Sequence, residues 1–68
     1  MEIYIKDMLP EEDKLVKVWC VDNESGRRAY GYYKIVSRDG ITLNWYDKTG
    51  HLAYELIDTW TPETWEKL

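Results

Sequence analysis

Cysteine, histidine and phenylalanine are scarce or missing in this chain of 68 residues. Cys20 is the only cysteine, so no internal disulfide can cross-link the fold, and His51 is the only histidine. With one residue of each kind, the sequence has no pair at metal-ligand spacing and few groups that could converge for hydrolytic or redox chemistry. We therefore expect a non-catalytic protein that holds no metal and needs no cofactor.

Positive charge and long apolar segments are scarce as well. Nine lysines and arginines stand against 13 acidic residues, and the net charge of −4 argues against a general binder of polyanions. The longest uninterrupted apolar run, Val18 to Val21, is too short to span a bilayer, and the first six residues lack the charge pattern of a signal peptide. Together with the lone cysteine, these features predict a cytoplasmic protein that does not act at a membrane.

Aromatic residues are abundant by contrast. The chain contains four tryptophans and six tyrosines, and 44% of its residues are apolar, which excludes a disordered chain. A chain this short forms one small domain, residues 1–68, that needs dense packing or a partner subunit to be stable without disulfides. Because every ring carries a polar atom, the composition suits half-buried faces of a sheet better than a dry helical core.

Apolar and polar residues alternate with period two through most of the chain, which predicts β-strands. Four runs separated by turn residues show the pattern: 14–22, 27–37, 41–46 and 52–58. Asp39-Gly40 predicts a tight hairpin, Asn23 to Gly26 and Asp47 to Gly50 predict the other turns, and Gly31 predicts a bulge or a close backbone approach.

The two ends follow other patterns. Residues 2–5 fit a short strand, and residues 9–13 fit an extended loop or a single helical turn. Thr61-Pro62-Glu63 is typical of a helix start, with threonine as cap and proline in the first position. We therefore expect a mainly β fold, a single small antiparallel meander or SH3-like half-barrel of four to five strands with a short C-terminal helical turn. Its expected core is Val16, Val18, Tyr33, Ile35, Leu43 and Trp45.

One face of the second run combines cations with rings. Arg28, Tyr30, Tyr32 and Lys34 share this face, Tyr46 on the next strand extends it, and residues 27–50 carry five cations against two acids. Such a face could stack nucleic-acid bases, or it could be ordinary cross-strand packing on a half-exposed sheet. Trp19 also lies opposite the apolar face of its strand, so we count it among the binding candidates.

The remaining reactive or charged groups have simpler interpretations. Cys20 lies on the apolar face of its strand and is expected to be an inert core residue. His51 is expected in an exposed loop, and Glu11-Glu12-Asp13 on the solvated surface, because this cluster lacks the spacing of a calcium loop. The acidic ends of the chain could meet a basic protein, or they could serve solubility alone.

Several segments together resemble a family of small phage- and prophage-encoded domains of unknown function. The matching pieces span nearly the whole chain in the family's order: Leu9 to Glu12, Val16 to Trp19, Gly31 to Tyr33, Trp45-Tyr46 and Trp60 to Pro62. The chain departs from the pattern at Asp13, where the family usually has glycine, and in its tail beyond Pro62. The resemblance implies an origin on mobile elements and a compact β-rich fold, and it transfers no catalytic residue.

These observations favour a small accessory protein that works by stoichiometric contact with a host or defence macromolecule, most simply a protein. The alternative is a nucleotide or single-stranded nucleic-acid binding module that uses the aromatic and basic face. We also expect self-association as a homodimer, because the aromatic surface exceeds what one thin sheet can cover.

Overall fold

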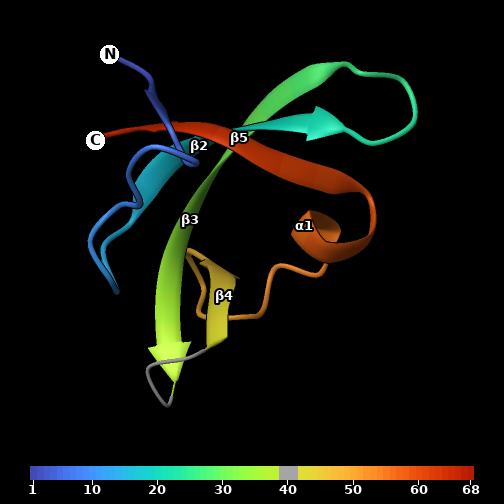
Figure 1. Cartoon of the computed structure of the whole chain (residues 1–68). Helices are drawn as coiled ribbons and strands as arrows, with labels where there is room; N and C mark the ends of the chain where they lie inside the picture. The colour runs from blue at the N-terminus through green and yellow to red at the C-terminus, as the bar shows by residue number, and fades with distance from the viewer. Residues whose placement is uncertain (39–41) are drawn as a thin grey trace.

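The computed structural model of the chain describes residues 1–38 and 42–68, and it is mainly β (Figure 1). Five antiparallel strands form one open sheet in the order β1-β5-β2-β3-β4, and one short helix lies between β4 and β5. The elements are β1 (Ile3–Tyr4), β2 (Val16–Asp22), β3 (Arg28–Arg38), β4 (Thr42–Asp47), α1 (Glu55–Asp58) and β5 (Trp60–Glu66). The predicted fold class and the upper limit of five strands are confirmed.

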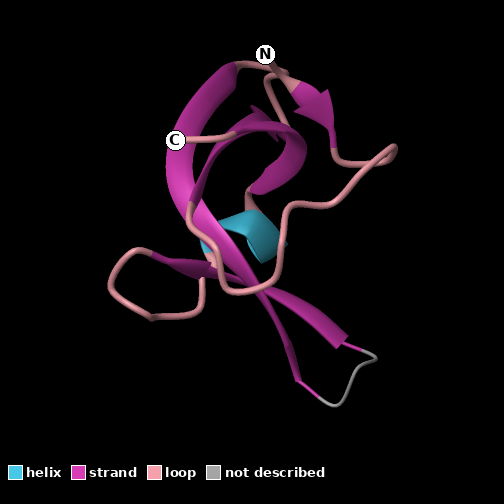
Figure 2. Cartoon of the chain, turned by 90° about the vertical axis from the view of Figure 1, so that its left-hand side faces the viewer, coloured by secondary structure: helices cyan, strands magenta, loops and turns pink. Residues whose placement is uncertain are grey.

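The strand order shows that the sheet is not a simple meander. β2, β3 and β4 follow one another, but β5 returns to the free side of β2 and pairs with it antiparallel. The sheet thereby curves round α1, as Figure 2 shows, so that one face is concave and covers the core. Of the two predicted arrangements, this one corresponds to the half-barrel.

The predicted alternation in β2 and β3 is confirmed. Val16, Val18 and Cys20 are buried on one side of β2, and Ile35 is buried on the same side of β3. No bulge interrupts the pairing of β3 at Gly31, but a side chain there would put its Cβ 2.6 Å from Cε2 of Tyr33. The close approach at this glycine is therefore made by the Tyr33 ring.

The pairing of β3 with β4 continues to Arg38 and Thr42. The predicted Asp39-Gly40 turn between them lies outside the described residues. At the other end of β4, the predicted turn at 47–50 is confirmed, because the Gly50 N–H donates to the Asp47 carbonyl at 3.0 Å. The Asp47 carboxylate accepts bonds from the Thr49 hydroxyl and from the backbone N–H of His51 and Thr49, which lowers its pKa.

The predicted strand at 52–58 is wrong. Leu52 makes an isolated bridge to Tyr46, and the chain then enters α1, whose Leu56 is buried. Ala53 and Leu56 are both in the core, three residues apart, as on one side of a helical turn. The apolar residues of this segment fit a helical turn as well as a strand, and tertiary packing selects the turn.

The predicted helix start at Thr61-Pro62-Glu63, and with it the short C-terminal helical turn, is also wrong. These residues belong to β5, which lies between β1 and β2. The register shifts between Trp19 and Cys20, whose partners are Thr64 and Pro62, so Glu63 is the extra residue of a β-bulge. A proline is tolerated at such a site because the ladder is interrupted there.

The core differs from the predicted one at several positions. Val16, Val18 and Ile35 are buried as expected, whereas Tyr33 and Trp45 only pack against the core from its margin. Leu43 is 50% exposed, so its assignment to the core is wrong. It pairs with Ser37 near the end of the β3–β4 hairpin, which extends away from the helix (Figure 2). The core residues that were not predicted are Ala53, Leu56 and Trp65.

Candidate functional site

The side of the sheet that faces away from the core, here called the outer face, carries the predicted binding residues. Trp19 of β2 lies opposite Tyr30 of β3, and Lys17 lies opposite Tyr32. Because side chains alternate along a strand, Arg28, Tyr30 and Tyr32 project together, on the side opposite Val16, Val18 and Cys20. The expected separation of β2 and β3 into an apolar and a mixed face is therefore confirmed.

Three of these rings form a continuous aromatic row. The ring centroids of Trp19 and Tyr30 are 5.1 Å apart at an interplanar angle of 61°, and those of Tyr30 and Tyr32 are 6.1 Å apart at 80°. Both arrangements are edge-to-face, the favourable geometry for such pairs. Tyr30 is 54% exposed and Tyr32 39% exposed, so a row that is ordered by its own contacts remains accessible to a partner.

Two cations lie over the Trp19 and Tyr30 rings of this row. The Lys17 ammonium lies 4.9 Å from the Trp19 centroid and 4.3 Å from the Tyr30 centroid. The Arg28 guanidinium lies 4.8 Å from the Trp19 centroid. All three distances are within the range of cation–π attraction, so Trp19 contacts two positive groups and Tyr30 contacts one.

Each of these cations also has a carboxylate partner. Arg28 contacts Glu2 at 2.6 Å and Glu63 at 3.1 Å, and it donates a hydrogen bond to the Thr64 hydroxyl at 3.2 Å. The Thr64 hydroxyl in turn donates to Glu2 at 2.6 Å. The bonds from Thr64 and Arg28 lower the pKa of Glu2, and the bond to Glu2 raises that of Arg28.

Glu66, the last residue of β5, completes this network. It lies 3.9 Å from the Lys17 ammonium, and it accepts a hydrogen bond of 3.3 Å from the Trp19 indole. Ring contacts, cations and carboxylates thus hold the Trp19 side chain in one orientation.

Lys34 and Tyr46 lie farther along the outer face. They are paired across β3 and β4, and Lys34 forms an ion pair of 3.1 Å with Asp13. Of the six predicted site residues, the structure joins Trp19, Arg28, Tyr30 and Tyr32 in one contact network and pairs Lys34 with Tyr46 across β3 and β4.

The sequence analysis missed part of this network. Lys17 has the same alternation as Trp19, and that signal could have identified it. Glu2 directly precedes β1, and Glu63 and Glu66 belong to β5, where the helix expected at the C-terminal end concealed them. Glu63, the extra residue of the bulge, and Thr64, the register partner of Trp19, both contact Arg28.

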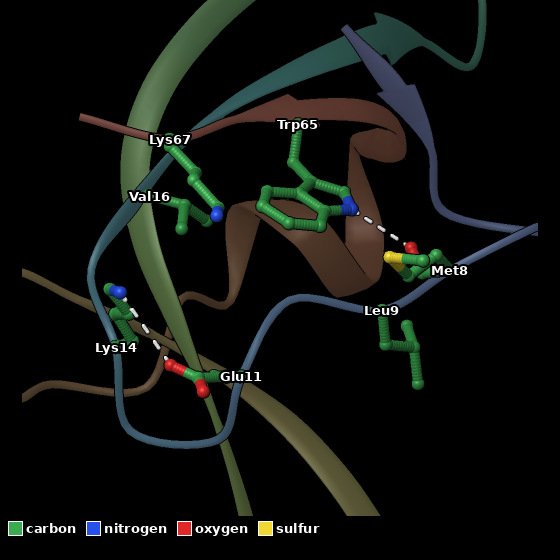
Figure 3. A pocket seen from close by; sticks show the side chains of 7 residues that line it. All are labelled: Met8, Leu9, Glu11, Lys14, Val16, Trp65 and Lys67. Carbon is green, nitrogen blue, oxygen red and sulfur yellow. Dashed lines mark hydrogen bonds and ion pairs between the residues drawn. The ribbon is translucent and has the colours of Figure 1, made fainter.

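A shallow cavity of about 240 Å³ lies on another part of the molecule (Figure 3). Trp65 and Val16 line it together with Met8 and Leu9, and its rim holds Lys67 and a Glu11–Lys14 ion pair of 3.5 Å. The Trp65 indole donates a hydrogen bond of 2.8 Å to the Met8 carbonyl, which fixes the segment from β1 to β2 against the core. Pro10 in this segment is buried.

The groups considered for chemistry lie apart from one another. Cys20 is buried, and loss of solvent around the thiol raises its pKa to about 11, so it remains protonated. His51 is exposed, with Nδ1 2.8 Å from the Thr49 hydroxyl. Among residues 1–38 and 42–68, no group of three His, Cys, Asp or Glu side chains is placed to hold a metal ion.

Within the described part of the chain, no helix has the length and apolar character needed to cross a membrane. Comparison of the chain with protein-family models, with curated proteins and with solved structures gives no match. The fold and the outer-face network are therefore the main guides to function.

Proposed function

We propose that this chain is a non-catalytic binding protein whose outer face contacts a partner protein through Tyr30 and Tyr32. The observation that carries the proposal is the aromatic row itself: two accessible tyrosines are ordered by edge-to-face contacts with each other and with Trp19. Aromatic anchors surrounded by charged groups are typical of the residues that dominate binding energy at protein interfaces. A pre-ordered row also loses less side-chain entropy on binding.

The ion pairs favour a protein partner over a nucleic acid. Phosphate binding requires cations that are free to neutralise the backbone. Arg28, Lys17 and Lys34 each already contact a carboxylate. A phosphate would have to displace Glu2, Glu66 or Asp13 from its partner, whereas a protein could contact the tyrosines and leave these pairs intact.

The alternative function is binding of a nucleotide or a single-stranded nucleic acid. The exposed rings of Tyr30 and Tyr32 support it, because bases stack on such rings regardless of sequence. A salt titration distinguishes the two functions. Binding of a labelled oligothymidine that weakens steeply between 50 and 200 mM salt would support the alternative, and no binding at low salt would exclude it.

The kind of partner follows from the resemblance to phage- and prophage-encoded domains. We propose a host or defence protein of the bacterial cytoplasm, bound stoichiometrically. The acidic ends of the chain would meet basic groups around the tyrosine contact, and such complementary charge raises association rates more than affinity.

Capture from a bacterial lysate tests the proposal. The chain and its Tyr30→Ala/Tyr32→Ala variant serve as baits, and mass spectrometry identifies bound proteins. A protein captured by the unchanged chain and lost with the double variant supports the contact. The control is Tyr54→Ala, which removes an even more exposed tyrosine, 65% accessible, next to α1. Equal capture by the double variant, with its melting temperature unchanged, would show that the row is not the contact surface.

A further inference from the structure

The strand edges of this sheet are protected in three places. The free side of β4 is covered at Trp45 and Asp47 by the chain that follows it, because the Asp47 N–H donates to the His51 carbonyl at 2.8 Å and the Ala53 N–H donates to the Trp45 carbonyl at 2.9 Å. At the opposite side of the sheet, the edge strand β1 has two residues. Beyond β1, the edge of β5 contains Pro62, which has no N–H to offer.

One stretch of edge lacks these protections. β4 begins its pairing with β3 at Tyr33, opposite Asp47, so residues 28–32 of β3 have β2 on one side and no described strand on the other. The Asp22 N–H donates to the Arg27 carbonyl, so Arg27 bonds toward β2. In an antiparallel strand, the N–H and C=O groups of successive residues point alternately to one side and the other. The backbone groups of Ala29 and Gly31 therefore also point toward β2, and those of residues 28, 30 and 32 point to the open side.

The side chains at this open edge carry little that would repel a second strand. Lysine and proline, the usual blocking residues, do not occur in residues 28–32. Arg28 is the one charged residue, and its guanidinium is held over Trp19 by Glu2 and Glu63, away from the edge. On the core side of the strand, Ala29 has a small side chain and Gly31 has none, and the Tyr33 ring lies over Gly31.

We infer that this edge pairs with the same edge of a second copy, as an antiparallel dimer centred on Tyr30. In this register Tyr30 lies opposite its own counterpart, and Arg28 lies opposite Tyr32 of the other copy. Each such pair exchanges both backbone hydrogen bonds, which would satisfy all the open groups of residues 28–32. The contact is self-complementary, as a two-fold interface requires, and no like charges face each other across it.

This inference goes beyond the proposed function and does not rest on it. In the dimer the sheets of both copies would be continuous, and their tyrosine rows would lie side by side on one outer face. An extended segment of another protein could occupy the same edge. A second copy is favoured because its own residues 28–32 form such a strand, and in this register they face the same segment without opposing like charges.

Sedimentation velocity over a concentration range from roughly 10 μM to 1 mM tests the dimer, because the dimer fraction must rise with concentration. The unchanged chain should shift from the mass of one chain toward twice that mass. Ala29→Lys puts a charge beside the open edge and should keep the protein at the mass of one chain. Ser25→Lys is the matched control, because it adds the same charge in the exposed turn before β3, and it should dimerise like the unchanged chain.

Hydrogen exchange of single amides tests the register independently of any variant. The amides of Ala29 and Gly31 bond to β2 and should be protected at every concentration. Those of Arg28, Tyr30 and Tyr32 should exchange fast in the dilute protein and slow down by at least about tenfold as the dimer forms. A dimer that leaves these three amides unprotected would overturn the inference and place the contact elsewhere. If the protein stays at the mass of one chain and these amides become protected only when another protein is added, the inference is wrong and the edge binds that other protein.

Discussion

Trp65 has two structural roles, because it fills the core and also tethers a loop. It is 4% exposed, and its indole donates to the Met8 carbonyl. Trp65→Phe should lower the free energy of unfolding by about 1 to 3 kcal/mol, since it removes ring volume and leaves a carbonyl without its donor. Urea unfolding followed by circular dichroism measures the loss.

Trp45→Phe is the matched control for this substitution, because Trp45 is only partly buried at the margin of the core. It should cost clearly less than Trp65→Phe. Equal losses would contradict the assignment of Trp65 to the centre of the core and of Trp45 to its edge.

Cys20 makes stability sensitive to alkaline pH. Its folded-state pKa of about 11 is above the value of about 8.5 for an exposed thiol, so the unfolded chain loses this proton first as pH rises. The thiol's contribution is therefore complete below about pH 8.5 and is lost as pH rises toward 11. Over that interval the stability of Cys20→Ala should rise relative to the unchanged chain by on the order of 2 kcal/mol.

Urea unfolding midpoints of both proteins, measured from pH 7 to 11, test this dependence. The comparison cancels the ionisation of the lysines and of the tyrosines other than Tyr33, whose pKa is raised in part by Cys20 itself. A difference between the two proteins that stays constant with pH would show that the thiol is not desolvated in the fold.

At the scale of elements, β5 is the strand on which the sheet depends. It pairs with β1 and β2 and carries Thr64 and Trp65, both buried. A chain that ends at Thr59 should therefore lose its cooperative unfolding transition and its β spectrum. A chain that ends at Glu66, without the two exposed terminal residues, should keep both. If the shorter chain still melted cooperatively, β5 would be an accessory strand instead of a central one.

At the scale of the whole molecule, carboxylates distributed over several turns and strands govern the response to acid. The pKa values of Glu2, Asp22 and Asp47 are all lowered in the fold, by a hydroxyl and a guanidinium at Glu2, by backbone N–H groups at Asp22, and by both a hydroxyl and backbone N–H groups at Asp47. A carboxylate whose pKa is lowered in the fold stabilises the protein at pH values above the pKa that it has in the unfolded chain, which is near 4. That contribution is lost as the pH falls through the folded pKa.

We therefore expect stability to be steady from pH 7 to about 5 and to fall steeply below about pH 4. Urea titrations at successive pH values, followed by tryptophan fluorescence, measure this fall. Asp47→Asn should reduce the steepness, because it removes one of the three groups. Stability that did not change between pH 5 and 2 would contradict the bonds assigned to these carboxylates.

The sequence by itself determined the parts of the fold that depend on local pattern. Alternation set the faces of β2 and β3, asparagine and glycine marked the turn at 23–26, and aspartate and glycine marked the turn at 47–50. The same alternation placed Trp19, Tyr30 and Tyr32 on the outer face. These features were predictable because a strand's two faces follow directly from the period of two, whatever the strand pairs with.

Tertiary structure alone decided the remainder, because several segments fit two local structures equally well. Thr61-Pro62-Glu63 is a good helix start, yet pairing with β2 and burial of the nearby Trp65 make it part of a strand. Leu43 alternates like a core residue, but it lies where the hairpin has already left the core. The ion pairs of Arg28 join residues more than 20 positions apart, and such contacts exist only once β1, β5, β2 and β3 lie side by side.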